Sequence, residues 1–537
     1  MKERKRLGRQ ISLLCGLVFL LAALQGCGAK EENFDNIPLT AKEETDIGFK
    51  NVSVHDPSIV KDNGSYYIFG SHLAAAKSQD LMNWSLIGSG VTKGNPVIPD
   101  AMNEMPEAFE WAKTDTFWAP DVIRLKDGKY YMYYCNCEGS SPLSCMGLAV
   151  SDSIEGPYSD KGIFLKSGMA GKSEDGNPYD ATKQPNVVDP CVFYDADGRL
   201  WMIYGSYSGG IFALEMDENT GLPLQPGYGK KLLGGNHLRI EAAYVQYNPD
   251  TEYYYMFLSF GGLTSDGGYN IRVCRSRTPD GPYYDSAGHD MIDCAGPGGS
   301  FFDDRTAEQY GVKLIGNYKW TWQEGEDGKN RRGLVSPGHN STYFDEETGD
   351  YFIIFHTRFE NMGENHEVRV HRMFFNEEGW PVISPYRYAG EDPEAYEEKA
   401  VPGRYKLLKH GRQITTQMEE SVNITLYSDG RVEGACTGSW ELSEDHHIKI
   451  TLGEDTYEGI VCRQYDEFGK KYVIGFTALS ENGEAAWLPS NEAPRINFIG
   501  GMMVWAVKVS KNTYIIAGTP DSQYVLWIVW ERLYLLS

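Results

Sequence analysis

DPSIVKDNGSYYIFGS, residues 56–71, is the first of five near-copies of one pattern in this chain. The other copies read APDVIRLKDGKYYMYY from Ala119, DPCVFYDADGRLWMIYGS from Asp189, AAYVQYNPDTEYYYMFLS from Ala242 and NSTYFDEETGDYFIIFHT from Asn340. Each copy joins two apolar or aromatic strands through a turn rich in Asn, Asp or Gly, residues that tolerate the positive φ of hairpin turns. Five hairpin repeats predict an all-β fold that closes as a five-bladed β-propeller.

Acidic residues open or precede several of these copies. Asp56 and Asp189 occupy the same position in the first and third copies. Equivalent positions of a propeller face one axis, so we expect these carboxylates to converge there.

Composition narrows the classes of partner. The chain has 537 residues, a formal net charge of −25 and 41% hydrophobic residues, which is enough for a packed core. The negative charge argues against binding to nucleic acid or to anionic membrane surfaces. It suits a soluble protein that handles neutral polymers.

The N-terminus reads as a targeting segment. Basic residues lie within residues 2–9, an apolar run covers Ile11 to Leu24, and Gly26-Cys27 follows. The apolar run is too short for a comfortable membrane span. We predict a bacterial lipoprotein signal over residues 1–27 with a lipidated Cys27, then a tether over residues 28–50. The alternative is an ordinary secretory signal with an incidental cysteine.

The second half of the chain predicts a separate module. Residues 51–391 carry the blades, and the charged stretch 390–398 reads as a linker. Short alternating strands then recur at 423–427, 439–442 and 447–452, which predicts a C-terminal β-barrel or sandwich over residues 396–537. The tail from 491 is atypical and apolar. It could complete the barrel or be a divergent terminus, and the sequence does not decide between these.

Eight cysteines remain outside the signal and Cys27. Export permits disulfides, but their pairing cannot be read from the sequence. The one-residue gap between Cys135 and Cys137 is unlike zinc-ligand spacing. We expect structural or free cysteines.

Five dispersed motifs occur in an order typical of one enzyme family. They are His55-Asp56-Pro57-Ser58, Trp118-Ala119-Pro120-Asp121, Asn186-Val187-Val188-Asp189-Pro190, His237-Leu238-Arg239-Ile240-Glu241-Ala242 and Gly338-His339-Asn340-Ser341. Over residues 52–391 the chain resembles glycoside hydrolase family 43, and within it the two-domain extracellular endo-α-1,5-L-arabinanases. The resemblance implies a five-bladed propeller with an axial site that hydrolyses with inversion at the anomeric carbon.

The resemblance also implies roles for three acids. Asp56 matches the general base, Glu241 the general acid, and Asp189 the residue that raises the pKa of Glu241 and orients it. Inversion needs one carboxylate to activate water and one carboxylic acid to protonate the leaving oxygen. A nearby negative charge disfavours ionisation of Glu241, so the pattern is physically sound. The structural alternative for each residue is a turn former or a solvated surface charge.

Other site residues follow from the same resemblance. His339 matches a histidine that contacts a central ion, often calcium, and its alternative is a core histidine bonded to backbone. Substrate contacts are expected from His55, Trp118, Asp121, Asn186, Ser206 and Arg358. Blade packing, turn formation or ion pairing is the alternative for these side chains.

The expected function is a surface-anchored bacterial endo-α-1,5-L-arabinanase. Its partners would be arabinan or other pectic side chains and, through the lipid alone, a membrane, and it would act as a monomer. The alternatives are an exo-acting α-L-arabinofuranosidase or β-xylosidase, and a non-catalytic arabinan-binding lipoprotein.

Overall fold

The computed structural model describes residues 46–168, 176–322, 326 and 331–491, together with the backbone of four strands nearer the C-terminus. The predicted signal peptide, Cys27 and most of the tether lie outside the described residues. None of the described helices is long and apolar enough to cross a membrane.

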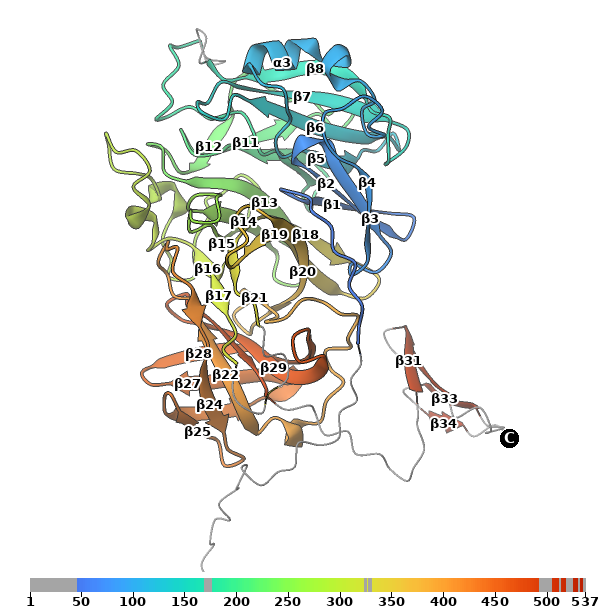
Figure 1. The fold of residues 1–537 in the computed structure, drawn as a ribbon, viewed down its shortest axis with the longest axis vertical. Helices are drawn as coiled ribbons and strands as arrows, with labels where there is room; N and C mark the ends of the chain where they lie inside the picture. Colours follow the sequence, from blue (N-terminus) through green and yellow to red (C-terminus); the bar gives the residue numbers. More distant parts are fainter. Residues whose placement is uncertain are drawn as a thin grey trace, which may run out of the picture. The chain divides into compact units, whose positions relative to one another are not determined.

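Five antiparallel sheets form the blades of a propeller (Figure 1). The first blade holds β1 (Ser58–Asp62), β2 (Ser65–Gly70), β3 (Ala74–Ser78) and β4 (Trp84–Gly88). The second holds β5 (Asp121–Arg124), β6 (Tyr130–Cys137), β7 (Ser144–Ser151) and β8 (Ser159–Lys166). The third holds β9 (Cys191–Tyr194), β10 (Leu200–Tyr204), β11 (Ile211–Met216) and β12 (Lys230–Leu233).

The fourth and fifth blades complete the ring. The fourth holds β13 (Ile240–Asn248), β14 (Tyr253–Phe260), β15 (Asn270–Ser276) and β16 (Val312–Ile315). The fifth holds β17 (Tyr318–Lys319), β18 (Leu334–Asp345), β19 (Asp350–Phe359), β20 (His366–Phe375) and β21 (Pro381–Ile383). The helices described are short: α2 (Ala101–Glu104), α3 (Pro106–Ala112) and the 3-10 turns η2 (Ser71–Leu73), η4 (Met291–Asp293), η5 (Asp304–Ala307), η6 (Glu398–Ala400) and η7 (Glu444–His446).

Each of the five sequence copies forms a hairpin of one blade, as predicted. They form the pairs β1–β2, β5–β6, β9–β10, β13–β14 and β18–β19. In the first copy Asn63 and Gly64 both have positive φ, 46° and 77°, which matches the twist of a two-residue hairpin. The turn residues therefore fix where each blade begins.

The propeller closes on itself. The inner strands β1, β5, β9, β13 and β18 contact one another in that order, and β18 contacts β1 again. A buried apolar cluster fills each junction between neighbouring blades, including the one between the fifth and the first. The Ser341 hydroxyl of β18 donates to the carbonyl of Pro57 at 2.6 Å across that last junction. Closure brings the starts of all five inner strands around one axis.

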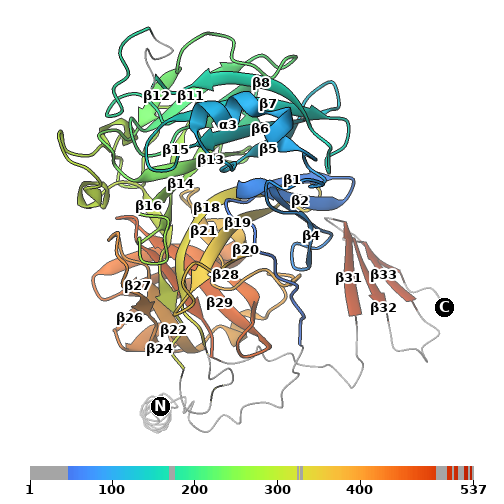
Figure 2. The same ribbon diagram turned by 45° about the horizontal axis from the view of Figure 1, so that its top comes forward.

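The C-terminal module is a closed eight-stranded barrel (Figure 2). Its strands are β22 (Gly403–Lys409), β24 (Val422–Leu426), β25 (Arg431–Gly434), β26 (Gly438–Leu442), β27 (His447–Leu452), β28 (Asp455–Asp466), β29 (Lys471–Ser480) and β30 (Ala485–Pro489). Strand β22 pairs with both β24 and β30, so the barrel closes without the tail. The tail strands β31 (Trp505–Ser510), β32 (Thr513–Ala517), β33 (Val525–Val529) and β34 (Arg532–Tyr534) form a sheet of their own. Of the two alternatives for this segment, completion of the barrel is therefore wrong.

Barrel and propeller share a core. Trp487 of β30 is fully buried and its ring lies 5.1 Å from that of Tyr318 and 6.2 Å from that of Trp320 in the fifth blade. The two-residue strand β23 (Glu419–Glu420) lies between the barrel strands β22 and β24 along the chain, but it pairs in parallel with β17 of the fifth blade. Buried Arg331 and Asp466 add an ion pair at 2.8 Å. The fifth blade is thus built partly from the second module.

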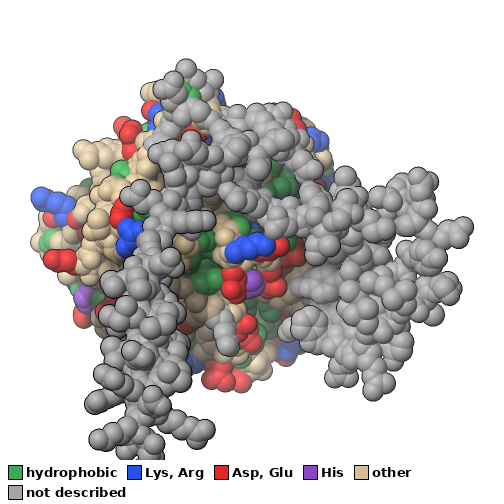
Figure 3. Space-filling view, turned by 90° about the horizontal axis from the view of Figure 1, so that it is seen from below, with side chains coloured by type: hydrophobic (Ala, Val, Ile, Leu, Met, Phe, Trp, Pro, Cys, Tyr) green, Lys and Arg blue, Asp and Glu red, His purple; other side chains and the backbone are tan. Residues whose placement is uncertain are grey.

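The eight cysteines within the described residues are all free, as expected, and seven of them are buried. Acidic side chains are seen at many places on the described part of the face in Figure 3, interspersed with basic ones. This distribution agrees with the net charge of −25.

Candidate active site

The chain turns through the left-handed region just before the inner strand in the first and third blades, and at a bulge within the inner strand in the fourth and fifth. The residues with positive φ are Asp56 (58°), Asp189 (56°), Ala242 (57°) and His339 (46°). Each stands two residues before the point where regular pairing with the next strand begins, which in the fourth and fifth blades is just after a bulge. Strained backbone of this kind persists where the surrounding structure enforces it, and it clusters at functional sites. The repeat therefore gives four of the five blades a left-handed residue at the same position, and Glu241 directly precedes Ala242.

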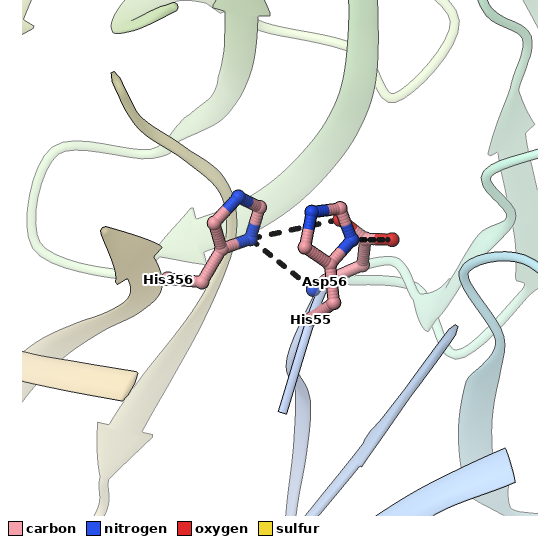
Figure 4. A group of neighbouring side chains, drawn as sticks. All are labelled: His55, Asp56 and His356. Carbon is pink, nitrogen blue, oxygen red and sulfur yellow. Dashed lines mark hydrogen bonds and ion pairs between the residues drawn. The ribbon is translucent and has the colours of Figure 1, made fainter. Parts of the chain in front are cut away.

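Asp56 lies among three histidines, of which His55 and His356 are drawn with it in Figure 4. Its Oδ2 is 2.7 Å from Nδ1 of His55 and accepts from the Ser71 hydroxyl at 2.5 Å, while its Oδ1 is 3.0 Å from Nδ1 of His339. Its backbone N–H donates to Nδ1 of His356 at 3.2 Å. Burial by itself would raise the pKa of Asp56, but the charges of His339 and His55 outweigh burial and hold that pKa well below its usual range. Asp56 is therefore a carboxylate, the form that can accept a proton from water.

Glu241, at the start of β13, has the opposite character. Oε2 accepts from the Ser206 hydroxyl at 2.7 Å and Oε1 accepts from the Tyr269 hydroxyl at 2.8 Å. Burial raises the pKa of Glu241, against the opposing effects of His339 and of these two hydrogen bonds. The environment therefore favours the protonated acid, held at both oxygens.

Asp189 is the third buried acid of the axis. Its Oδ2 accepts from the backbone N–H of Ala242 at 3.3 Å, which ties it to the residue after Glu241. Burial, with added repulsion from Glu241 and Asp56, raises the pKa of Asp189 to about 8, although His339 opposes this. Asp189 and Glu241 interact strongly, so their protons are a property of the pair.

His339 supplies positive charge among these acids. Burial would lower its pKa, but Asp56 and Asp189 raise it to about 9. Its backbone N–H donates to Ser259 at 2.7 Å, which fixes the strand at this point. An imidazolium amid three carboxyl groups partly balances the charge of the axis.

A second layer surrounds Asp56. The rings of His55 and His356 stack at 4.1 Å, and the guanidinium of Arg358 lies 3.2 Å from Nε2 of His55 and 3.3 Å from Nε2 of His356. Arg358 also pairs with Glu364 at 2.6 Å. These contacts hold the two imidazoles against the base and connect Arg358 to it indirectly.

A pocket of about 330 Å³ opens beside this layer. Its lining includes His55, Ser71, Trp118, Leu263 and Arg358. The indole N–H of Trp118 donates to the carbonyl of Cys137 at 3.1 Å, so the half-buried ring is fixed at the pocket wall. Of the expected substrate-binding residues, His55, Trp118 and Arg358 are thus positioned to meet a ligand.

The other expected contacts lie elsewhere. The carboxylate of buried Asp121 accepts from the Ser58 hydroxyl and from the backbone N–H of Val192 at 2.5 Å, so it joins three blades. Asn186 is half-buried and accepts from the Cys137 thiol at 3.8 Å. Ser206 serves Glu241, as described above. A direct sugar contact from these three side chains stays a prediction.

Asp121 does not hold the same position in its copy as Asp56 and Asp189 hold in theirs. Counted from the first paired residue of each inner strand, it corresponds to Ser58 and Cys191, while Ala119 holds the place of Asp56 and Asp189. Asp121 is therefore the first paired residue of its strand, two residues after the position that Asp56 and Asp189 hold in their copies.

Sequence reasoning missed Tyr269 and His356. His356 ends the fifth copy beside Arg358, so its place in the repeat could have signalled it. Tyr269 lies outside every copy, and only the fold brings its hydroxyl to Glu241.

The acidic residues around His339 would attract a cation, but His339 does not belong to the metal-ligand group found among the described residues. Among the described residues, the metal-capable group found is His55, Asp56 and His356, with ligand atoms within 4.8 Å of one another. In both histidines of this group, Nδ1 already contacts Asp56 and Nε2 already contacts Arg358. Calcium prefers oxygen ligands, and the described protein atoms give His339 no such set.

Comparisons with known proteins agree with this geometry. Residues 47–312 match the model of glycosyl hydrolases family 43, and residues 385–488 match a C-terminal lipocalin-like domain found with that family. The chain is 58% identical over 440 residues to extracellular endo-alpha-(1->5)-L-arabinanase 2 of Bacillus subtilis, covering 82% of this chain and 93% of the relative. The chain belongs to glycosyl hydrolase family 43.

Two further known proteins are similar over an equal share of the chain. The extracellular endo-alpha-(1->5)-L-arabinanase of Thermotoga petrophila is 49% identical, covering 82% of this chain and 94% of the relative. A crystal structure of a family 43 glycoside hydrolase from Bacillus licheniformis is 56% identical with a TM-score of 0.80, covering 82% of this chain and 99% of that one. The likeness therefore includes both the propeller and the barrel.

Proposed function

We propose that this family 43 enzyme is an endo-α-1,5-L-arabinanase that cleaves internal bonds of arabinan with inversion of configuration. The observation that carries the proposal is the opposite surroundings of two buried acids: imidazoles contact Asp56 and lower its pKa, whereas neutral hydroxyls contact Glu241, whose pKa burial raises. Relatives named as extracellular endo-arabinanases, similar over both modules, support the choice of substrate.

The mechanism assigns one proton transfer to each acid. Asp56 accepts a proton from a water molecule as that water attacks the anomeric carbon. Glu241 gives its proton to the oxygen of the leaving arabinosyl unit, so the glycosidic bond breaks and the configuration inverts. His55 and His339 hold Asp56 in place, while Ser206 and Tyr269 hold Glu241. The Asp189–Glu241 pair keeps its last proton because losing it would leave two buried carboxylates that repel each other, and Asp189 also anchors the backbone N–H of Ala242.

A product profile on debranched linear arabinan tests the proposal. An endo enzyme releases a range of short oligomers first, and NMR of the first product should show the inverted anomer. Arabinose alone from the start would instead mean exo action. Release of sugars from xylan but not from arabinan would show that the substrate is xylan.

We further propose that the enzyme is anchored at the bacterial cell surface through lipid on Cys27 and acts there as a monomer. The relatives are named as extracellular, and all the proposed catalytic groups come from one chain. Cys27→Ser should abolish labelling by a fatty-acid analogue. Labelling that persists in this variant would refute the anchor.

We also propose that a calcium ion binds at His339 in place of the proton that its imidazole otherwise holds, because the carboxyl groups around this residue favour positive charge there. Water would supply most of its ligands, and the ion would add positive charge to the axis. Chelation should lower the melting temperature or activity and calcium should restore it. If elemental analysis finds no ion in active enzyme, the calcium proposal is refuted, whereas the proposed roles of the three acids are unaffected.

A further inference from the structure

The most exposed large apolar side chain among the described residues is Phe301, in the loop between β15 and β16. It is 66% exposed, and neighbouring Phe302 is 41% exposed. Apolar surface of this kind costs free energy in water, and exposed apolar patches mark binding surfaces. No step of the proposed mechanism uses either ring.

The two rings are held in place by their neighbours. Their centroids are 4.1 Å apart, and the ring of His237 lies 4.7 Å from that of Phe301. Tyr207 meets Phe302 edge-on at 5.6 Å, and the guanidinium of Arg239 lies 5.5 Å from the centre of that ring. Arg239 is in turn paired with buried Asp304. We call Phe301 and Phe302, with His237 beside them, the aromatic platform.

The platform adjoins the proposed acid. Tyr207 follows Ser206, which donates to Glu241, and the backbone N–H of Tyr207 donates to the carbonyl of Ile240 at 2.9 Å. Arg239 precedes Glu241 by two residues. Both residues that contact Phe302 are therefore on the segments that hold the acid.

The pocket of about 330 Å³ adjoins the other acid. Its lining includes His55 and Ser71, the partners of Asp56, and none of the platform residues. In an inverting reaction the acid stands on the side of the leaving group and the base on the opposite side. The platform is therefore on the leaving-group side of the cleavage point.

We propose that Phe301 and Phe302 bind the arabinosyl units on the leaving-group side of the scissile bond by stacking against their C–H faces. This inference rests on the proposed function and adds a binding surface to it. Aromatic rings offer large apolar faces at low cost in conformational entropy, which suits a neutral, partly apolar sugar. Because such a platform binds sugar units beyond the scissile bond, it favours long chains as substrates and cleavage at internal bonds.

The test compares Phe301→Ala and Phe302→Ala with Phe301→Trp, which keeps a ring. Each alanine variant should raise KM for linear arabinan by about tenfold or more, because it removes the burial of one aromatic ring. It should change kcat less and shift the early products, while Phe301→Trp should stay near the wild type. Leu86→Ala, which changes another exposed apolar residue on the outermost strand of the first blade, is the matched control.

Binding is also measured directly in a Glu241→Gln background, by calorimetry with a linear α-1,5-arabino-oligosaccharide that spans the cleavage point. Adding either Phe301→Ala or Phe302→Ala should weaken binding about tenfold, with an unchanged circular dichroism spectrum. Unchanged KM, products and binding in both alanine variants would overturn the platform while the wild type still cleaves arabinan. A wild type that releases no arabino-oligosaccharides would instead overturn the proposed function.

Discussion

Oδ1 of Asp56, before the first blade's inner strand, lies 3.0 Å from Nδ1 of His339 on the fifth blade's inner strand. This contact crosses the point where the propeller closes, and both residues have left-handed backbone. It lowers the pKa of Asp56 and raises that of His339. Closure of the ring and ionisation of the proposed base therefore depend on the same pair of residues.

Asp56→Asn and Glu241→Gln should each abolish most hydrolysis of linear arabinan. Loss of a general base or acid costs on the order of 10²–10⁴-fold in rate. The change keeps the shape of each side chain, so melting temperature should fall little. Glu347→Gln, on a side chain that is 87% exposed, is the control. Near-wild-type turnover by either variant would contradict the assignment.

Asp189→Asn should move the alkaline limb of the pH–rate profile to lower pH. In the wild type the last proton of the Asp189–Glu241 pair is held by repulsion between the two carboxylates as well as by burial. Asparagine removes that repulsion, so Glu241 loses its proton at lower pH. The measurement is kcat/KM against pH, and a limb that does not move would show that Asp189 does not tune the acid.

Gly338→Ala should impair the acid through Tyr269. A Cβ at residue 338 would lie 2.1 Å from two carbons of the Tyr269 ring, which would have to move away from Glu241. Displacement of about 1 Å near a reacting group can cost on the order of 10²-fold in rate. Gly48→Ala, where nothing lies within 4 Å, is the matched control. Full activity of Gly338→Ala would mean that the Tyr269 contact is dispensable.

Trp487→Ala should destabilise the propeller as well as the barrel. The indole is fully buried and packs against Tyr318 of the fifth blade and His410 of the barrel. Truncation of a buried tryptophan costs about 3–5 kcal/mol. Calorimetry should show one transition at a lower temperature, and Val422→Ala, on an exposed barrel residue, should shift it little. A propeller transition that stays in place would show that the two modules are stable independently.

Much of the fold could be predicted because the hairpin is a local unit. Turn residues such as Asn63 and Gly64 set each first hairpin, and five copies set the number of blades. The alternation of short strands after residue 403 likewise indicated a second β module. Local sequence did not show that this module gives β23 to the fifth blade, because that pairing joins segments whose contact depends on tertiary packing.

The sequence by itself determined the positions of Asp56 and Asp189, because both stand at one place in a repeated unit. Resemblance added Glu241 and His339. Only the tertiary structure decided what surrounds them: Tyr269 contacts Glu241 and His356 contacts Asp56. It also packed Phe302 against Tyr207 and Arg239, the neighbours of the acid in sequence. It also assigned Asp121 to inter-blade hydrogen bonds. The physical reason is that a pKa and a side-chain partner depend on neighbours from other blades, which become neighbours only when the ring closes.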